Sequence, residues 1–282
     1  AVVLRSISIW LMDDCQFVGN NAGASGGAIF STGDSTWEWT NVILDRNVVS
    51  LGVGVGGAVY VDAPSHQWTM DSCTFSNNYA PSDHQAILWT SFSGDLAKFL
   101  WTNLTVFGHN GSAVITLSTS VTTKVDGAIV GSHFHDNDAT VLSVITNGAT
   151  QQQSIQVNST QIINNKEGLS LSGSGTSWKL IFYDTLMEAN DQSISFVGDE
   201  AEVTVSACQF TNNGVLGSTS GSALRLQSTT LTLIMTDSRF MNNLGALGGA
   251  IWLNWIQSTT ITLTASHVTF ESNRACNGGA IA

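Results

Sequence analysis

The sequence is poor in charged residues and in proline. Charged side chains make up 11% of its 282 residues, well below the usual quarter, and only two prolines occur. Hydrophobic residues reach 43%, which is enough for a continuous core and excludes a disordered chain. No stretch approaches 18 consecutive apolar residues, so no membrane insertion is expected. The scarcity of proline leaves long sheet ladders uninterrupted.

Positive charge is also scarce. Nine Lys and Arg residues stand against 21 Asp and Glu, for a formal net charge of −12. A nucleic-acid partner or an anionic lipid surface requires a basic patch, and the sequence has none, so neither partner is expected. No calcium-binding nonapeptide pattern occurs, and no cofactor is expected.

One short pattern recurs along the whole chain: an apolar residue, two variable residues and an asparagine. Its ten instances lie about 28 residues apart. They are Phe17/Asn20, Leu44/Asn47, Phe75/Asn78, Phe107/Asn110, Phe134/Asn137, Ile162/Asn165, Met187/Asn190, Phe210/Asn213, Phe240/Asn243 and Phe270/Asn273. A Gly-Gly-Ala-Ile/Val tetrapeptide follows the Asn near both ends, starting at Gly26, Gly56, Gly248 and Gly278, and decays in the middle of the chain.

The segment before each apolar position alternates with the period of a strand. Residues seven and five positions before it, such as Trp37 and Trp39, are apolar in almost every repeat, whereas the residue between them is mostly polar. Each repeat therefore holds three short strands and no helix. The sequence predicts an all-β fold: a right-handed parallel β-helix of about ten coils, as one domain over residues 1–282. A leucine-rich repeat is excluded because its second Leu position holds small residues such as Cys15 and Thr160.

The recurring residues have structural explanations. Asn tolerates the left-handed backbone of a sharp turn, and stacked Asn amides can form a hydrogen-bonded ladder. Gly-Gly provides a tight corner. Three of the four cysteines, Cys15, Cys73 and Cys208, share one repeat position but lie too many coils apart for disulfides, so we expect buried thiols.

The paired Phe-x-x-Asn and Gly-Gly-Ala-Ile/Val motifs resemble the repeats of the chlamydial polymorphic outer membrane proteins. The resemblance is strongest over residues 15–30, 44–60 and 240–281. It implies a surface-displayed β-helix used in adhesion, and hence a cell-surface or extracellular location. The family supplies no catalytic residues to carry over.

Aromatic residues divide into inward and outward sets. Trp10, Trp37, Trp39 and Trp68 fall on inward positions, as a core stack. The predicted interaction stripe consists of the outward Phe30, Tyr60, Leu88 and Trp252 on the third strand and Trp101 on the first. Its partner is another protein chain, another segment of the same chain or a glycan, and we favour a protein contact.

Three N-glycosylation sequons begin at Asn103, Asn110 and Asn158. Asn103 and Asn158 are assigned the same repeat position and are the better candidates. Asn110 is assigned to the Asn ladder, where its amide would be engaged.

Catalytic chemistry finds little support. Polysaccharide-cleaving β-helices need clustered carboxylates, and the acids here are scattered. Asp184 and Asp237 would carry such an activity, with His267 one coil from Asp237. His109 and Asp136 are assigned adjacent equivalent positions, but a solvated turn is favoured over a metal site.

These observations favour a non-catalytic extracellular β-helix that serves structure or adhesion in a surface assembly or filament. The chain begins on a strand at Ala1 and stops inside a coil without a polar cap. We therefore expect either a longer protein or copies that stack end to end. The alternative is a polysaccharide lyase or hydrolase.

Overall fold

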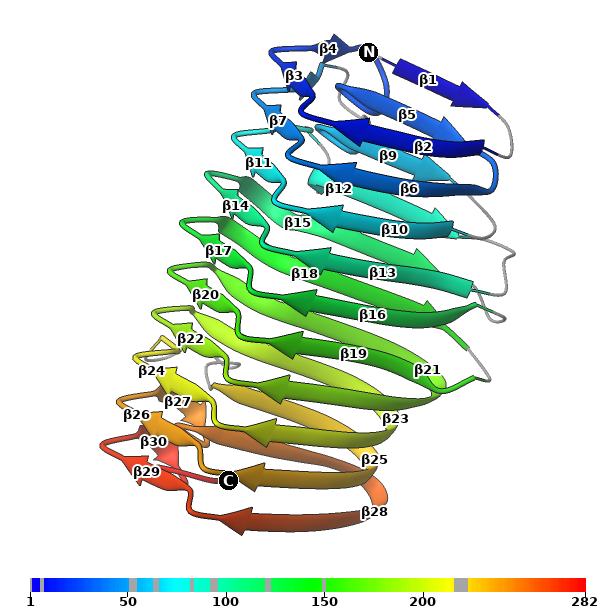
Figure 1. The fold of residues 1–282 in the computed structure, drawn as a ribbon. Coiled ribbons are helices and arrows are strands. Elements are labelled where there is room, and N and C mark those ends of the chain that lie inside the picture. Colours follow the sequence, from blue (N-terminus) through cyan, green and yellow to red (C-terminus); the bar gives the residue numbers. More distant parts are fainter. Residues whose placement is uncertain are drawn as a thin grey trace.

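The computed structural model describes residues 2–5, 8–50, 55–62, 66–81, 84–91, 96–119, 123–148, 151–215 and 223–282 (Figure 1). Within them the chain forms strands β1–β30 and no helix, and consecutive repeats stack as coils of a right-handed parallel β-helix. No segment of the described residues forms a helix long and apolar enough to cross a membrane.

One sheet is built from ten three-residue strands, one from each repeat. They are β3 (Gln16–Val18), β7 (Ile43–Asp45), β11 (Thr74–Ser76), β14 (Thr105–Phe107), β17 (His133–His135), β20 (Gln161–Ile163), β22 (Leu186–Glu188), β24 (Gln209–Thr211), β26 (Arg239–Met241) and β29 (Thr269–Glu271). About eight coils have a neighbour on both sides, because β3 and β29 end the sheet. The number of fully stacked coils is therefore slightly below the ten repeats.

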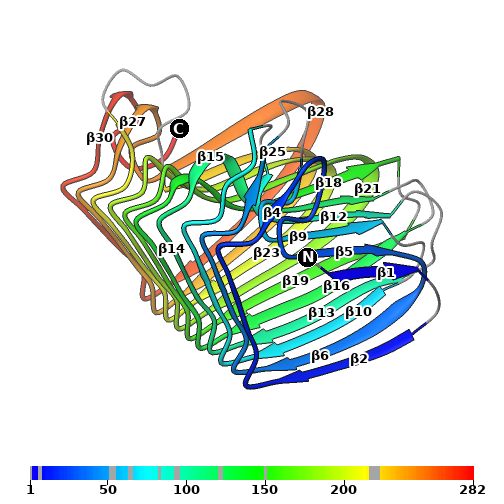
Figure 2. The same cartoon turned by 90° about the horizontal axis from the view of Figure 1, so that it is seen from above.

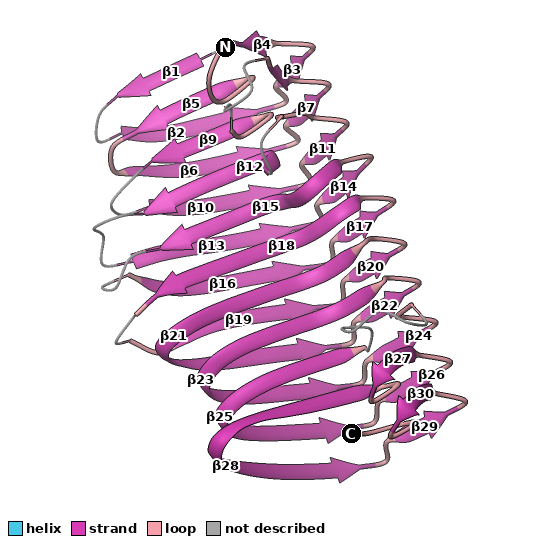
Figure 3. Cartoon of the chain, turned by 180° about the vertical axis from the view of Figure 1, so that it is seen from behind, coloured by secondary structure: helices cyan, strands magenta, loops and turns pink. Residues whose placement is uncertain are grey.

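The second sheet has sixteen strands in two layers. The first-strand layer contains β2 (Ser8–Asp13), β6 (Ser35–Thr40), β10 (His66–Asp71), β13 (Leu96–Thr102), β16 (Lys124–Val130) and β19 (Gln153–Asn158). The third-strand layer contains β1 (Val2–Arg5), β5 (Ile29–Thr32), β9 (Val59–Asp62), β12 (His84–Ser91), β15 (Asn110–Thr119) and β18 (Asp138–Asn147). The later strands β21 (Glu167–Tyr183), β23 (Gln192–Ser206), β25 (Leu224–Thr236) and β28 (Ile251–Ser266) bend from the third-strand layer into the first-strand layer of the next coil (Figure 3).

In the described ranges two small sheets occur, and both lie where the Gly-Gly motif is intact. β4 (Asn21–Ala22) pairs with β8 (Val48–Val49), and β27 (Leu244–Leu247) pairs with β30 (Arg274–Asn277). We call the segment between a ladder Asn and the third strand of its coil an excursion. The excursions that carry β27 and β30 project from the stack (Figure 2). A Cβ on Gly27 would overlap the carbonyl oxygen of Gly57 and crowd the backbone of Val48. Gly-Gly is thus required where an excursion folds back against its neighbour.

The core follows the predicted inward positions. Trp37, Trp39 and Trp68 are buried, with ring centroids 4.8 to 5.1 Å apart. Further along the stack, the Phe210 and Phe240 rings stack at 4.7 Å. Stacked equivalent side chains therefore bury the apolar face that no single coil could bury alone.

The fourth coil corrects the predicted register by one residue. Val106, not Phe107, pairs with Phe75 and with Phe134, and it is fully buried. Trp101 consequently pairs with Met70 and Ile129 and lies in the core, so its predicted outward position is wrong. Phe107 is the half-buried, outward residue instead.

The left-handed turn residue is also displaced from its predicted place. Positive φ angles occur at the residue directly before a ladder Asn, as in Asn77 (φ 51°) and Asn242 (φ 54°). A second set marks the corner after the first strand, where Asp14, Asn41 and Asp237 have φ of about 50°. The ladder Asn is therefore selected for its amide and not for its backbone conformation.

Cys73 and Cys208 are buried thiols, as expected, and burial raises the pKa of each to about 11. Cys15 is half-buried and Cys276 is exposed. All four are free, so hydrogen bonds and packing, and no disulfide, hold the coils together at the cysteine positions.

Candidate functional site

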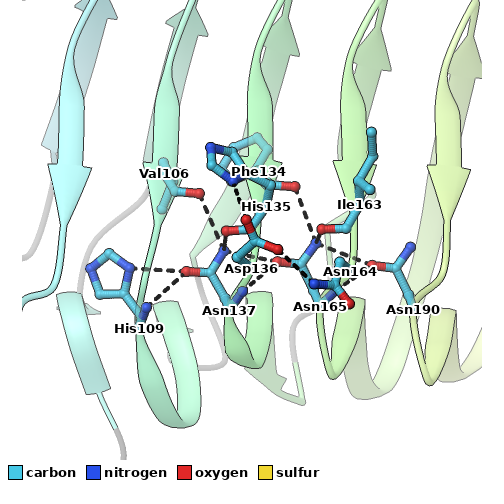
Figure 4. Close-up of polar contacts among 10 residues, drawn as sticks. All are labelled: Val106, His109, Phe134, His135, Asp136, Asn137, Ile163, Asn164, Asn165 and Asn190. Carbon is cyan, nitrogen blue, oxygen red and sulfur yellow. Dashed lines mark hydrogen bonds and ion pairs between the residues drawn. The ribbon is translucent and has the colours of Figure 1, made fainter.

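The side-chain ladder runs along the corner after the short strands. In Asn137, Oδ1 accepts the backbone N–H of His109, while Nδ2 donates to the Asn165 Oδ1 (2.8 Å) and to the Val106 carbonyl (3.2 Å) (Figure 4). Each ladder side chain between the two end members therefore bonds to the coils on both sides and supplies partners to buried backbone groups. The ladder comprises Asn20, Asn47, Asn78, His109, Asn137, Asn165, Asn190, Asn213, Asn243 and Asn273.

His109 takes the ladder position in the fourth coil. Its Nδ1 lies 3.0 Å from Asn137 Oδ1, and its Nε2 lies 3.5 Å from Asn78 Nδ2. Because the Asn137 oxygen carries no proton, Nδ1 donates, and Nε2 is left to accept from the Asn78 amide. A neutral imidazole thus imitates Asn, and burial lowers the pKa of His109 to about 4.

This arrangement corrects two predictions. Asn110 is not in the ladder but lies exposed at the start of β15. Asp136 aligns with Gly108, whose N–H donates to its carbonyl, and is exposed, so His109 and Asp136 do not share a position and form no metal site. Across the described ranges, no three His, Cys, Asp or Glu side chains converge in a way that could hold a metal ion.

A polar cluster lies on the outward face of the short-strand sheet. His133 and His135 flank the buried Phe134, and both are half-buried. His135 Nδ1 lies 2.8 Å from Asp136 Oδ2, and Asn164 Nδ2 donates to Asp136 Oδ1 (2.6 Å). These hydrogen bonds hold the pKa of Asp136 below its usual value, whereas burial, with His135 nearby, lowers the pKa of His133. The cluster can recognise a polar partner.

The apolar stripe lies on the outward side of the third-strand layer. Phe30 pairs with Tyr60 in register, and their rings stack at 5.3 Å. Val3 extends the row into the first coil, where it is 56% exposed. Leu88 occupies the next register position but is only 6% exposed, so the accessible stripe is Val3, Phe30 and Tyr60.

Trp252 lies at the opposite end of this layer and belongs to a different surface. The Arg225 guanidinium lies over its ring, 4.8 Å from the centroid. The row of residues that pair in register from Tyr60 to Arg225 crosses several coils, so this pair lies far from Tyr60. The predicted five-residue stripe is therefore divided: an aromatic pair near one end, a cation–π pair near the other, and Trp101 in the core.

The three sequon asparagines occupy three different environments. Asn103 is exposed at a corner, and its Nδ2 donates to Asp71 Oδ1 (2.9 Å). Asn158 is half-buried at the end of β19, in register with Val130 and Tyr183. Asn103 and Asn158 do not share a repeat position, because Thr102 is the residue that pairs with Val130. Asn110 was predicted to be engaged in the ladder, but it is exposed at the start of β15.

The candidate acids lie at exposed corners. Asp184 accepts from Ser159 Oγ (3.1 Å) beside a groove of about 270 Å³ that Gln161 and Gln209 also line. Asp237 lies 3.3 Å from His267 Nδ1, which matches the predicted spacing of one coil. Ala207 separates the two acids along the corner, and both of the Asp237–His267 side chains are largely exposed. These groups are solvated polar surface with a shallow groove beside one of them.

Comparison with known proteins agrees with this architecture. The family described as right-handed beta helix region matches residues 57–234, and the chain belongs to that family. The chlamydial polymorphic membrane protein repeat matches residues 267–282, which relates the last coil to proteins of the outer membrane and surface. The comparisons with curated proteins and with solved structures gave no match.

Proposed function

We propose that the protein is a non-catalytic, extracellular or cell-surface β-helix that contributes structure or adhesion through protein contacts. The observation that carries this proposal is the stacked Phe30–Tyr60 pair on the outward side of the third-strand layer. The outward aromatic pair and the exposed Val3 are neighbours in register, so they form one contiguous apolar patch. The chlamydial repeat supports the location at a cell surface.

The occupant of the stripe is a second copy of the chain or a neighbouring segment of a longer chain. Aromatic side chains make strong protein contacts because a large rigid area is buried at little entropic cost. In a surface assembly or filament, the stripe would join coils side by side. The sequons at Asn103 and Asn110 lie elsewhere, so glycans there would leave the stripe open.

The test is self-association of the purified protein. Sedimentation velocity and electron microscopy should show oligomers or fibres for the wild type, and Phe30→Asp or Tyr60→Asp should convert them to monomers. Thr36→Asp, an outward substitution on β6 of the first-strand layer, is the matched control and should leave assembly intact. If the wild type remains monomeric at high concentration and the variants behave in the same way, the proposed protein contact through the stripe is contradicted.

A polysaccharide lyase or hydrolase is the second candidate. The groove beside Asp184 is the observation that favours it, with Asp237 as the second acid along the same corner. Incubation with acidic and neutral polysaccharides should then release oligosaccharides, and Asp184→Asn and Asp237→Asn should abolish the release. Absence of cleavage by the wild type across such a panel supports the non-catalytic proposal.

A further inference from the structure

A row of small hydroxyl side chains crosses the middle of the third-strand layer. Ser143, Ser170 and Ser195 pair in register on its outward side, in the row that holds Tyr60 near one end and Arg225 and Trp252 near the other. Serine side chains are smaller than the Tyr, Arg and Trp side chains towards the two ends of the row. This row alone does not define a ligand, but charged and polar groups border it.

Glu167 is the central group at this border. Thr140 Oγ1 donates to its Oε2 (2.9 Å), the Ser170 hydroxyl also contacts the carboxylate, and Arg225 acts on it through its positive charge. These contacts place the carboxylate on the outward side, beside the serine row. Burial is the largest effect on Glu167 and raises the pKa of its carboxyl group. The carboxylate is therefore held in a partly dry environment and keeps acceptor capacity beyond its two hydroxyl contacts.

Two hydrogen-bond donors beside Glu167 are buried without a partner. Gln192 pairs with Glu167 in register, one coil further, and is 8% exposed; its Nε2 has no hydrogen-bond partner. The Nε of Arg225 is buried and unpartnered as well, while its guanidinium lies over Trp252. Buried donors are almost always satisfied, because an unmade hydrogen bond costs free energy. Two such donors next to a carboxylate point to a ligand that supplies acceptors and a donor together.

We propose that Glu167, Gln192 and Arg225 form a binding site for a neutral, polyhydroxylated ligand, a sugar unit of a glycan. Adjacent strands place Glu167 and Gln192 about 4.8 Å apart, a spacing that a vicinal diol can bridge. One hydroxyl donates to the Glu167 carboxylate, and its neighbour accepts from Gln192 Nε2 or Arg225 Nε once these buried side chains turn towards the sugar. The Glu167 charge and the net charge of −12 disfavour an anionic sugar. The serine row leaves room for the chain to continue along the layer.

This site goes beyond the proposed protein contact and lies at a different part of the same layer. The contact through Phe30 and Tyr60 and the sugar site at Gln192 use no common residue. Loss of assembly in Phe30→Asp and loss of sugar binding in Gln192→Met are therefore separate results, and either proposal can fail alone.

The experiment uses neutral tetrasaccharides built from glucose, mannose, xylose, galactose or N-acetylglucosamine, with tetragalacturonate as the anionic comparison. Isothermal titration should detect at least one neutral tetrasaccharide, with tetragalacturonate bound more weakly. Gln192→Met keeps the side-chain length but removes the donor, and it should weaken binding about tenfold, as loss of one hydrogen bond predicts. Gln67→Met, on the outward face of β10, is the control and should bind as the wild type does.

Thermal unfolding without sugar distinguishes a binding role from a structural one. Because Gln192 Nε2 has no hydrogen-bond partner in the fold, Gln192→Met should leave the Tm unchanged or raise it. A lower Tm would assign the amide to the scaffold and overturn the proposal. Binding of none of the neutral sugars, tighter binding of tetragalacturonate, or equal loss in Gln67→Met would also overturn it.

Discussion

Replacing His109 with Asn should make the protein more resistant to acid. The ordinary pKa of His is about 6.5, and burial in the ladder lowers that of His109 to about 4. Between these values the unfolded chain binds a proton that the folded chain does not, so stability falls as the pH falls from 6.5 towards 4. Above pH 6.5 the imidazole is neutral in both states and has no such effect. At about 1.4 kcal/mol per pKa unit, the loss reaches roughly 3 kcal/mol at pH 4.

The structural reason is the proton on Nε2. In the folded chain Nδ1 already donates to Asn137 Oδ1, and Nε2 faces the Asn78 amide group, which is itself a donor. In a protonated ring, the N–H at Nε2 of His109 would face the N–H of the Asn78 amide, and two buried donors would be left without an acceptor between them. Asn at this position carries one acceptor and one donor group at every pH, as the neighbouring coils show for Asn137 and Asn165.

The assay is urea unfolding of the wild type and His109→Asn at pH 7 and pH 4. The stability advantage of His109→Asn should increase by about 3 kcal/mol between the two pH values. The buried His66, whose pKa burial lowers to about 3, is present in both proteins and cancels in the difference. Gln67→Asn, an exposed substitution on β10, serves as the control and should leave the pH dependence unchanged. Equal acid sensitivity of wild type and His109→Asn would refute the reasoning.

Three further substitutions and one modification test the remaining structure. Asn190→Leu removes an amide that bonds both neighbouring coils and should lower the free energy of unfolding by more than about 3 kcal/mol, measured by urea titration. Phe210→Ala opens a cavity under Phe240 and should cost about 3–5 kcal/mol in the same assay. Gly27→Ala forces a methyl group against the Gly57 carbonyl and should lower the Tm of the native protein. After secretion from eukaryotic cells, Asn110→Gln should lose the mass of one glycan, because Asn110 is exposed and outside the ladder.

The sequence predicted the coil, its inward residues and the ladder, because each is a property of a repeated position. Its one register error arose where the motif is degenerate. Phe107 fits the apolar position better than Val106 by residue type, and Asn110 fits the ladder better than His109. Only hydrogen-bond chemistry shows that a neutral imidazole replaces an Asn amide. The inward pair Phe99 and Trp101, which continues the aromatic stack of the earlier coils, was the signal for the correct register.

The contacts between side chains could not be predicted in the same way. Register placed Phe30 beside Tyr60, but only packing decides that Leu88 is covered while Val3 is exposed. The unpartnered Nε2 of Gln192 likewise has no sequence signal, since a polar residue at a corner is expected to be solvated. Burial of a polar group depends on neighbouring coils, which a repeat pattern describes only on average.

The loss of the glycine motif in the middle of the chain therefore has a physical meaning. Gly27 and Gly249 precede the first inward residue of the third strand by two positions, and a Cβ at either would overlap backbone of the next coil's excursion. In the middle coils the chain runs directly from the ladder into β18, β21 and β23, so no excursion packs there. The same position is then free to carry a side chain, and it holds Thr140, Glu167 and Gln192. In the middle coils, where the glycine motif is lost, packing does not require glycine at this position. Glu167 and Gln192 of the candidate sugar site occupy it.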